Sequence, residues 1–281
     1  MDFNTVIIDG PYLSHRSYDA PYNLFRSDGQ KVTQIHSFLR SLILLNKKFQ
    51  PERIAVAWES HGTQQWRRVI LPSYKSSRHK ISDEFITQQE DLKEILHKLN
   101  IEQFSAPGNE ADDVIAALTE NYPKPIAIHT TDKDIMQLLN EKVRVWDGKK
   151  LIGPDFVEKK YGVSPERLRL LLSITGDASD DIPGISGVGP VKAKKILDSL
   201  LGLNTELFEV LESLGKERAE IISRNLKLIR LNNSCKLEPF ETTSKLTINQ
   251  ILDKYELFKI QSELQNFQVR KSNVVSLERF F

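Results

Sequence analysis

Acidic residues carry the clearest chemical signal in this 281-residue sequence, because they recur where folded chains place reactive groups. Three short apolar runs lead directly to the acids Asp9, Glu59 and Asp132. The other acids of interest lie in tight loops or at the start of helical patterns, and they are Glu110, Asp112, Asp113, Asp134, Asp177 and Asp180. Carboxylates that converge repel one another, so such a set requires raised pKa values or bound cations. Because oxygen ligands without His or Cys pairs select Mg²⁺ or Mn²⁺ over Zn²⁺, we expect divalent ions of that kind.

Each acidic group also has a simpler explanation when it is taken alone. Acids are favoured in the first turn of a helix, and Asp, Ser and Gly together form turns. Three independent helix caps need not include Asp9 and Glu59, however, so the whole set favours metal binding. A set of this size suits two metal ions roughly 4 Å apart, the arrangement that hydrolyses phosphodiesters by activating a water and stabilising the leaving oxygen.

The elements that must position these acids alternate along the chain. Strand-like runs lie at 5–8, 53–58, 125–131, 143–146 and 151–152, and helical patterns lie at 33–47, 83–99, 110–121 and 132–139. Buried β-branched runs between helices predict an α/β fold with a parallel sheet. Parallel strands share one carboxyl edge, where the strand-end acids should converge. From residue 154 onward, helices separated by Gly/Pro turns predict a second, helical domain.

The composition is that of an ordinary globular protein, with 40% hydrophobic and 27% charged residues. Cys235 is the only cysteine, so an internal disulfide is impossible and a cytoplasmic location is expected, in a bacterium or a virus-infected host cell. The N-terminus lacks the pattern of a signal peptide, and the most apolar stretch, at 42–45, is too short to span a membrane. The net charge of +1 gives little support for a nucleic-acid partner, but the charges are segregated locally.

The segment 60–82 contains no Asp or Glu and is rich in cations. Its basic residues are Arg67, Arg68, Lys75, Arg78 and Lys80, with Trp66 and Tyr74 between them. A solvated basic loop would explain the charges. Aromatic rings between cations are nevertheless what a single-strand channel needs, because bases stack on the rings while the cations neutralise phosphates. Arg67 and Lys75 are candidates for stabilising the transition state.

A Gly-rich hairpin followed by a basic helix lies at 182–195. Its candidate contacts to DNA are Gly187, Gly189, Lys192, Lys194 and Lys195. Exposed backbone N–H groups at a helix start bind phosphate, and contacts of this kind hold a duplex without reading its sequence. A simple turn between two helices is the alternative, but the run of lysines without a nearby acid favours DNA binding.

In their order along the chain, these motifs resemble those of the 5′-nuclease (flap endonuclease) superfamily. The resemblance rests on Asp9-Gly10 with Arg16, on Arg67 with segment 74–78, and on the acidic motifs 110–113, 131–134 and 176–180. It covers roughly residues 3–265 and is greatest to the 5′–3′ exonuclease domain of bacterial DNA polymerase I and to stand-alone phage 5′ nucleases. It implies a PIN-like α/β sheet flanked by helices and a helix-hairpin-helix (H3TH) domain that often binds K⁺.

The resemblance further implies the domain layout and the residue roles. The expected parts are a catalytic domain at 1–165 with a helical arch at about 60–100, a DNA-binding domain at 166–265 and a tail at 266–281. One Mg²⁺ would be held by Asp9, Glu110 and Asp112, and the other served by Asp132, Asp134, Asp177 and Asp180, with Asp113 close by. Arg67 and Lys75 would attend the scissile phosphate, and Tyr74 and Arg78 would line the arch. Glu59 stands where the family usually has Asp, and its longer side chain would ligate directly or through water.

The expected function is that of a Mg²⁺-dependent, structure-specific 5′ nuclease, in which Mn²⁺ can replace Mg²⁺. Its implied substrates are 5′ flaps, nicked duplexes and RNA primers in DNA replication and repair, and a monomer is expected. One alternative is a non-catalytic protein that binds DNA junctions, although the intact acids argue against it. Another is a PIN-type ribonuclease, although the hairpin after Asp181 favours duplex DNA.

The C-terminal tail resembles peptides that dock replication proteins on sliding clamps. Its candidate contacts are Leu277, Phe280 and Phe281, while Val274 stands where Gln is usual. Folding of the two aromatic residues onto the core is an equally good explanation, because short motifs are prone to false positives. No polymerase domain follows, so a free-standing nuclease is expected.

Overall fold

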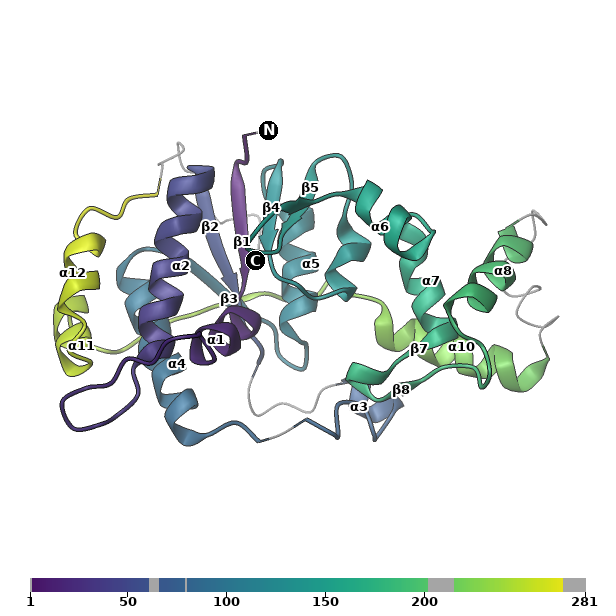
Figure 1. The fold of residues 1–281 in the computed structure, drawn as a ribbon, viewed down its shortest axis with the longest axis horizontal. Coiled ribbons are helices and arrows are strands. Elements are labelled where there is room, and N and C mark those ends of the chain that lie inside the picture. The colour runs from purple at the N-terminus through teal and green to yellow at the C-terminus, as the bar shows by residue number, and fades with distance from the viewer. Residues whose placement is uncertain (1, 61–65, 79, 202–214, 270–281) are drawn as a thin grey trace.

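A seven-stranded sheet lies at the centre of the molecule (Figure 1). The computed structural model describes residues 2–60, 66–78, 80–201 and 215–269. In spatial order the strands are β6 (Leu151–Ile152), β5 (Val143–Trp146), β4 (Ile126–His129), β1 (Thr5–Asp9), β2 (Arg53–Ala57), β3 (Glu102–Ser105) and β9 (Glu238–Pro239). The inner strands are parallel, and β6 and β9 pair antiparallel at the edges. The predicted parallel α/β sheet is confirmed, with an antiparallel strand added at each edge.

The strand order brings together the ends that lead to acids. β1 pairs with β4 on one side and with β2 on the other, so that Ile8 lies level with His129 and Asp9 with Ala57. Because these strands run in one direction, Asp9 shares an edge of the sheet with the residues that follow β2 and β4. The predicted convergence of the three strand ends is therefore confirmed.

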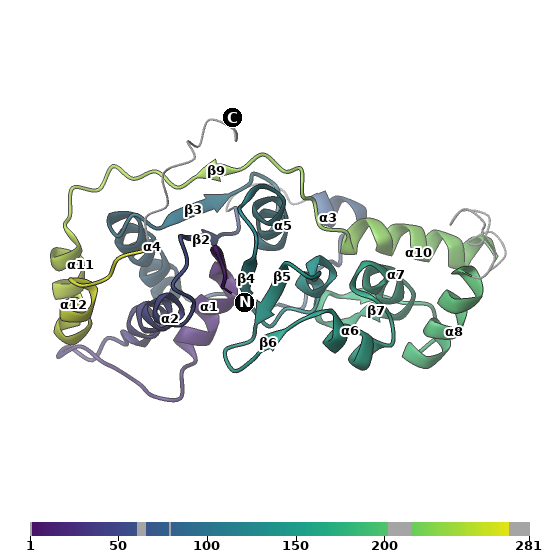
Figure 2. The same ribbon diagram turned by 90° about the horizontal axis from the view of Figure 1, so that it is seen from above.

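Alternation along the strands assigns the helices to two layers, which Figure 2 shows on opposite sides of the sheet. In β1, Val6 and Ile8 join one hydrophobic cluster and Ile7 joins the other. The first face is covered by α1 (Gly10–Tyr18), α2 (Thr33–Phe49), α4 (Asp83–Lys98), α11 (Ile248–Lys254) and α12 (Phe258–Leu264). The second is covered by α5 (Ala111–Asn121), the 3₁₀ helix η1 (Asp134–Leu138) and α7 (Pro165–Thr175). Within the described ranges, no helix is both long and apolar enough to cross a membrane.

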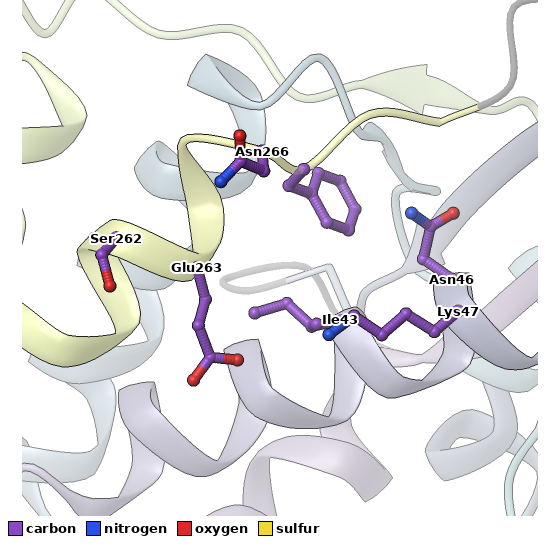
Figure 3. A pocket seen from close by; sticks show the side chains of 7 residues that line it. Ile43, Asn46, Lys47, Ser262, Glu263 and Asn266 are labelled. Carbon is purple, nitrogen blue, oxygen red and sulfur yellow. The ribbon is translucent and has the colours of Figure 1, made fainter.

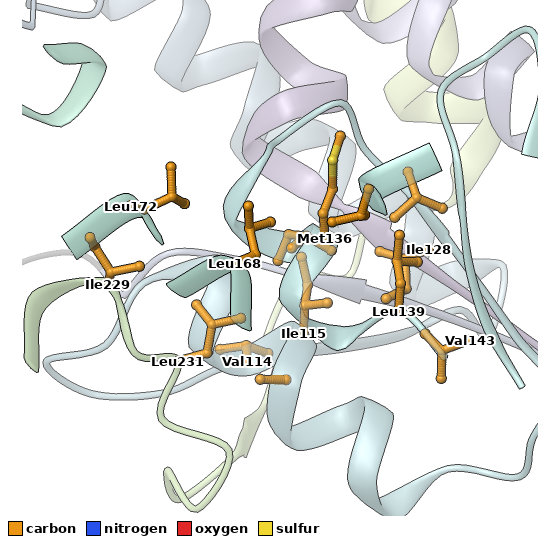
Figure 4. Packing of buried hydrophobic residues seen from close by; sticks show 14 of the residues in the cluster. Val114, Ile115, Ile128, Met136, Leu139, Val143, Leu168, Leu172, Ile229 and Leu231 are labelled. Carbon is orange, nitrogen blue, oxygen red and sulfur yellow. The ribbon is translucent and has the colours of Figure 1, made fainter. Parts of the chain in front are cut away.

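The helical part of the chain extends from one end of the sheet (Figures 1 and 2). Besides α7 it contains α6 (Pro154–Tyr161), α8 (Pro190–Leu201), α10 (Lys216–Ile229), the small sheet of β7 (Gly176–Asp177) and β8 (Ile182–Pro183), and the 3₁₀ turn η2 (Ala178–Asp180). Figure 4 shows Leu168, Leu172 and Ile229 of this part in one hydrophobic cluster with Val114 and Ile115 of α5. Apolar packing therefore fastens the helical part to the sheet.

The helical part ends earlier than predicted. The chain returns to the main sheet after α10, where β9 pairs with β3, and α11 and α12 then pack on α4 and α2. Leu252 and Tyr255 are fully buried there. A helical domain reaching residue 265 is therefore wrong, because the C-terminal helices complete the core of the first domain.

The predicted arch at about 60–100 is also too long. α4 occupies its second half, and Leu92, Ile95 and Leu96 of this helix are fully buried in the core. The described remainder consists of α3 (Trp66–Ile70) and the turns that follow it. Periodicity alone does not distinguish an arch helix from a core helix, since both have an apolar face.

Candidate active site

Asp9 is held at the carboxyl end of the central strand. Its Oδ1 accepts a hydrogen bond from Tyr12 N (3.0 Å), which caps α1, and its Oδ2 accepts one from Thr130 Oγ1 (2.7 Å) just after β4. The Asp cap followed by Pro11 explains why a helix begins here. Burial raises the pKa of Asp9 to about 7, although both hydrogen bonds lower it. Asp9 is thus a buried carboxyl that holds its proton until near neutral pH unless a cation binds.

Asp9, Asp112 and Asp132 form the first acidic group. Asp112 lies in the first turn of α5, and Asp132 follows β4, where its Oδ1 accepts a hydrogen bond from Asp134 N (2.8 Å). Burial raises the pKa of Asp112 well above its usual range, and the charges of Asp132 and Asp9 raise it further. Burial also raises the pKa of Asp132. These three predicted ligands therefore lie close enough for their charges to act on one another, and their joint ligation of a metal stays a prediction.

Glu59 and Glu110 flank the first acidic group. Glu59 lies two residues beyond β2 and is partly exposed, and its charge contributes to the raised pKa of Asp9. Glu110 is buried at the start of α5 and is hydrogen-bonded by Tyr74 and Lys75. Both acids lie where a ligand or an outer partner of a metal would be, and their direct ligation stays a prediction.

Asp134, Asp177 and Asp180 form the second acidic group. One carboxylate oxygen from each lies within 4.8 Å of the others, and all three residues are buried. Oδ1 of Asp134 and Oδ2 of Asp177 are buried, and neither has a hydrogen-bond partner in the described part of the chain. Burial, followed by the charges of Asp132 and Asp177, raises the pKa of Asp134 well above its usual range. Buried carboxylate oxygens without donors are costly, so this group fits a cation that accepts several oxygen ligands, such as Mg²⁺.

Lys133 places an ammonium group beside the second acidic group. Its Nζ donates to Asp177 Oδ1 at 2.5 Å, and Ser179 donates to the same oxygen from N (2.9 Å) and Oγ (2.6 Å). Burial acts to raise the pKa of Asp177, but these donors outweigh it and lower the pKa below its usual value. Lys133 therefore neutralises part of the charge that a metal would neutralise.

Replacing Lys133 by Met should strengthen divalent-ion binding, because it removes a competing charge and keeps the apolar stem. Lys133 is about one-third exposed, so solvent screening moderates the effect, and we expect the half-saturating Mg²⁺ concentration to fall roughly tenfold. Titration calorimetry measures this directly. Lys124→Met, an exposed charge before β4, is the control and should change little. Unchanged or weaker binding by Lys133→Met would show that the ammonium does not compete with the metal.

The turn after α3 brings two more cations to the acids. Lys75 Nζ donates to Glu110 Oε1 (2.6 Å) and lies 3.6 Å from Asp180, and Arg78 donates to Asp180 Oδ1 (2.8 Å). Ser77 N donates to Asp181 Oδ2 (2.9 Å), which fastens the turn to the acidic loop. Burial acts to lower the pKa of Lys75, but the neighbouring acids, Glu110 first, outweigh it and raise the pKa. Lys75 is thus charged beside the acids, where it was expected.

Tyr74 does not line a channel. The residue is 2% exposed, and its hydroxyl donates to Glu110 Oε2 (2.9 Å). Burial raises its pKa, so the phenol remains a neutral donor. A buried ring cannot stack on a base in an open groove, and the prediction that Tyr74 binds nucleic acid directly is wrong in this structure.

Arg67 and Asp113 form a buried ion pair with exposures of 2% and 0%. Arg67 Nη1 and Nη2 donate to the two carboxylate oxygens of Asp113 at 2.6 and 2.8 Å. The guanidinium also donates to Leu228 O (2.8 Å) and Arg230 O (3.2 Å), at the end of α10. Because these contacts occupy the guanidinium, Arg67 is not placed to contact a phosphate. Because both of its carboxylate oxygens accept from Arg67, Asp113 is not placed to bind a metal. Both predicted roles are corrected to a structural one.

Metal uptake should release protons near neutral pH. The pKa of Asp9 rises from 3.8 to about 7 on folding, so a cation that binds at about pH 6 must displace a proton. We expect the Mg²⁺ affinity, measured calorimetrically, to increase between about pH 6 and pH 8. For the metal-free protein the sign is opposite: the native state binds the extra proton, so stability falls as pH rises from about 4 to 7. Asp9→Asn should flatten both trends, and a pH-independent affinity in the parent protein would contradict the assignment.

The predicted DNA-contacting hairpin is open to solvent. Gly187 has a φ of +72°, and a Cβ added at Gly187 or Gly189 would meet nothing within 4 Å. Four of the predicted basic contacts are exposed, namely Lys192, Lys194 and Lys195 at the start of α8 and Arg16 on α1. The backbone of the hairpin is therefore accessible to a large ligand, and its contact with DNA stays a prediction.

A surface pocket of about 340 Å³ lies between α2 and α12, away from this chemistry (Figure 3). Its lining residues are Ile43, Asn46, Lys47, Ser262, Glu263, Asn266 and Phe267. The carboxylate of Glu263 is paired with Arg40 at 2.8 Å. Neither acidic group contributes to the lining, so the pocket is not part of the candidate active site.

Three residues that build the site escape prediction from the sequence: Thr130, Lys133 and Asn232. Asn232 N donates to Asp113 Oδ1 (2.7 Å), and its side chain donates to Asn109 Oδ1 (3.1 Å). Lys133 carries a usable signal, since it stands between two acids. Thr130 and Asn232 act through contacts with distant segments, which spacing along the chain does not reveal.

Comparisons with known proteins agree with this geometry. A profile of the family described as "5′-3′ exonuclease, N-terminal resolvase-like domain" matches residues 4–162. Proteins named 5′-3′ exonuclease from Mycoplasmopsis pulmonis and Aquifex aeolicus are 32% and 31% identical, over 94% and 98% of this chain and 93% and 95% of their own length. The T5 5′-exonuclease with bound zinc superposes with a TM-score of 0.62 at 21% identity, covering 95% of this chain and 100% of the other. Flap endonuclease-1 from Methanococcus jannaschii has a TM-score of 0.62 at 14% identity, covering 94% and 91% of the two chains. The two structures share the fold, and the matches in sequence show that the chain belongs to the 5′–3′ exonuclease family.

Proposed function

We propose that this protein is a divalent-metal-dependent, structure-specific 5′ nuclease that hydrolyses phosphodiesters of DNA with 5′ flaps or nicks. The observation that carries the proposal is the meeting of two acidic groups beside a basic turn that bonds Glu110 and Asp180. The second group is buried, and among the described residues two of its carboxylate oxygens have no hydrogen-bond partner. Two Mg²⁺ ions, when bound there, would supply an activated water and neutralise charge on the phosphate. Family membership supports the reaction class, and related structures contain DNA: a T5 flap endonuclease with product and Rad2 with substrate.

The side chains would divide the work as follows. Asp9, Asp112 and Asp132 would hold one ion, and the second acidic group would hold the other. Arg78 is half exposed and bonded to Asp180, so a metal at Asp180 would release the guanidinium toward a phosphate. Lys75 is buried and charged, and it would stabilise negative charge that grows in the transition state.

DNA would be gripped by the open hairpin before α8. Backbone N–H groups around Gly187 and Gly189 would meet the duplex phosphates, with K⁺ as a bridge, and Lys192, Lys194 and Lys195 would add positive charge. Binding should then weaken steeply with salt. RNA primers are included among the proposed substrates, and a cytoplasmic monomer is the proposed form.

The clamp-binding prediction falls outside the described residues. Leu277, Phe280 and Phe281 remain the candidate contacts. Deleting 276–281 should weaken binding to a sliding clamp and leave intrinsic cleavage unchanged. Equal clamp affinity of the shortened and full-length proteins would refute it.

The proposed activity is tested with a labelled duplex that carries a 5′ flap, beside a matched 3′-flap duplex. With Mg²⁺, we expect incision of the 5′-flap strand near the junction, and a chelator should abolish it. Cleavage in chelator, or equal cleavage of both duplexes, would contradict the proposal.

A further inference from the structure

A pocket of about 270 Å³ lies where α3 meets the end of α10. Figures 1 and 2 both show these two helices side by side. The lining consists of Trp66 and the following residues at or beyond the end of α10: Lys227, Arg230, Leu231, Asn232, Asn233 and Ser234. Apart from Trp66 and Leu231 the lining is polar, and its described residues include two positive charges and no acid.

Three polar groups of the pocket are free to interact with a ligand: the indole N–H and two cationic side chains. Trp66 Nε1 is buried, and no acceptor for it lies among the residues that the structure describes. Lys227 and Arg230 are exposed, and neither takes part in the ion pairs formed by the described residues. A buried N–H without an acceptor is costly, and unpaired cations attract anions. Charges near a helix C-terminus are favourable in themselves, which accounts for Lys227 and Arg230 but not for the unpartnered indole. The two cations therefore suit a ligand with a negative charge, and a shift of the Trp66 side chain would let an acceptor on the same ligand reach the indole N–H.

The pocket is one layer of side chains away from the acids. Arg67 lies over the Trp66 ring, with its Cζ 4.4 Å from the ring centroid. The same guanidinium pairs with Asp113 and lies 3.4 Å from Glu110. Asn232 lines the pocket and is bonded to Asp113 through its N–H. A DNA strand that passed the acids would therefore run close to this pocket.

We propose that this pocket binds one nucleotide of the single-stranded 5′ arm of the substrate, an inference that rests on the proposed function. Lys227 and Arg230 would take the phosphate, and Trp66 with Asn232 would contact the sugar or base. Cations beside an aromatic ring are the usual platform for single strands. The volume suits a single nucleotide, whereas a duplex would not enter it.

The binding test uses the full-length protein in chelator and a fluorescent hexathymidylate, read by anisotropy. Lys227→Gln/Arg230→Gln should weaken binding at least roughly tenfold. Lys216→Gln/Arg218→Gln removes the same charge from exposed positions about 15 Å away on α10, and it should weaken binding less than about twofold. Trp66→Phe, which keeps a ring but removes the N–H, should give an intermediate loss. Equal losses of affinity in the two double variants would refute binding in the pocket, because unspecific attraction between charges would then explain the result.

A second measurement separates this inference from the proposed function. The parent protein and the Lys227→Gln/Arg230→Gln variant are assayed on a long-flap duplex and on a nicked duplex without a flap, and thermal melting checks that each protein is folded. If the pocket binds the 5′ arm, the ratio of the cleavage rates on the flap and on the nick should be roughly tenfold lower in the variant. An unchanged preference would refute the pocket alone. If the parent protein cleaves neither substrate, the proposed function fails instead.

Discussion

Asp134→Asn should nearly abolish cleavage and at the same time stabilise the metal-free protein. Asp134 is buried, and Asp132 and Asp177 repel its charge. One of its oxygens has no hydrogen-bond partner among the described residues. Loss of a metal ligand removes several kcal/mol of transition-state stabilisation, so kcat should fall about 10³-fold. The same change removes one of several negative charges that repel one another. It should raise the free energy of unfolding of the metal-free protein by on the order of 1 kcal/mol. The melting temperature in chelator should therefore rise by about 2–4 °C.

The two opposite effects make this substitution informative. Activity is measured on the 5′-flap duplex, and stability is measured by calorimetry with and without Mg²⁺. Asp155→Asn is the control, because Asp155 is exposed on α6 and lies outside both acidic groups. It should change neither quantity much. A destabilised metal-free Asp134→Asn protein would mean that this carboxyl is structural.

Arg67→Met should destabilise the protein by about 3–5 kcal/mol, because it leaves Asp113 buried without its partner. Asp113→Asn should also destabilise it, though less, since the amide remains polar. Urea unfolding measures both changes. Replacing the pair together, as Arg67→Met/Asp113→Leu, should recover part of the loss, because an apolar pair carries no unpaired buried charge.

Recovery will be incomplete, since Leu228 O and Asn232 N lose partners in the double variant. The expected pattern distinguishes a structural arginine from a catalytic one. If Arg67→Met keeps the parent stability and loses only cleavage, the guanidinium contacts the substrate and the structural assignment is wrong.

The sheet and its acidic edge could be predicted because their signals are local. The strands β1, β2 and β4 read as continuous apolar runs, and each ends at an acid or within three residues of one. The order β4–β1–β2 then places Asp9 between the other strand ends. Helices α2, α4 and α5 were also predictable, because each buries one face and its apolar residues therefore recur with the period of a helix.

The errors all concern contacts between distant segments. Arg67 and Asp113 are 46 residues apart, and each looks like part of an active-site motif when it is read alone. Tyr74 has the composition of a channel residue, but its burial depends on α5 and the acidic loop. β9 has only two residues, which is too short for a strand pattern, so the return of the chain to the main sheet could not be seen.

The central claim is that the two acidic groups hold two divalent ions, and Mn²⁺-soaked crystals test it most directly. Anomalous diffraction should show one peak among Asp134, Asp177 and Asp180 and a second beside Asp9, Asp112 and Asp132. Asp134→Asn should remove or weaken the first peak. Absence of ions from both groups at saturating Mn²⁺, or a peak at the Arg67–Asp113 pair, would contradict the account.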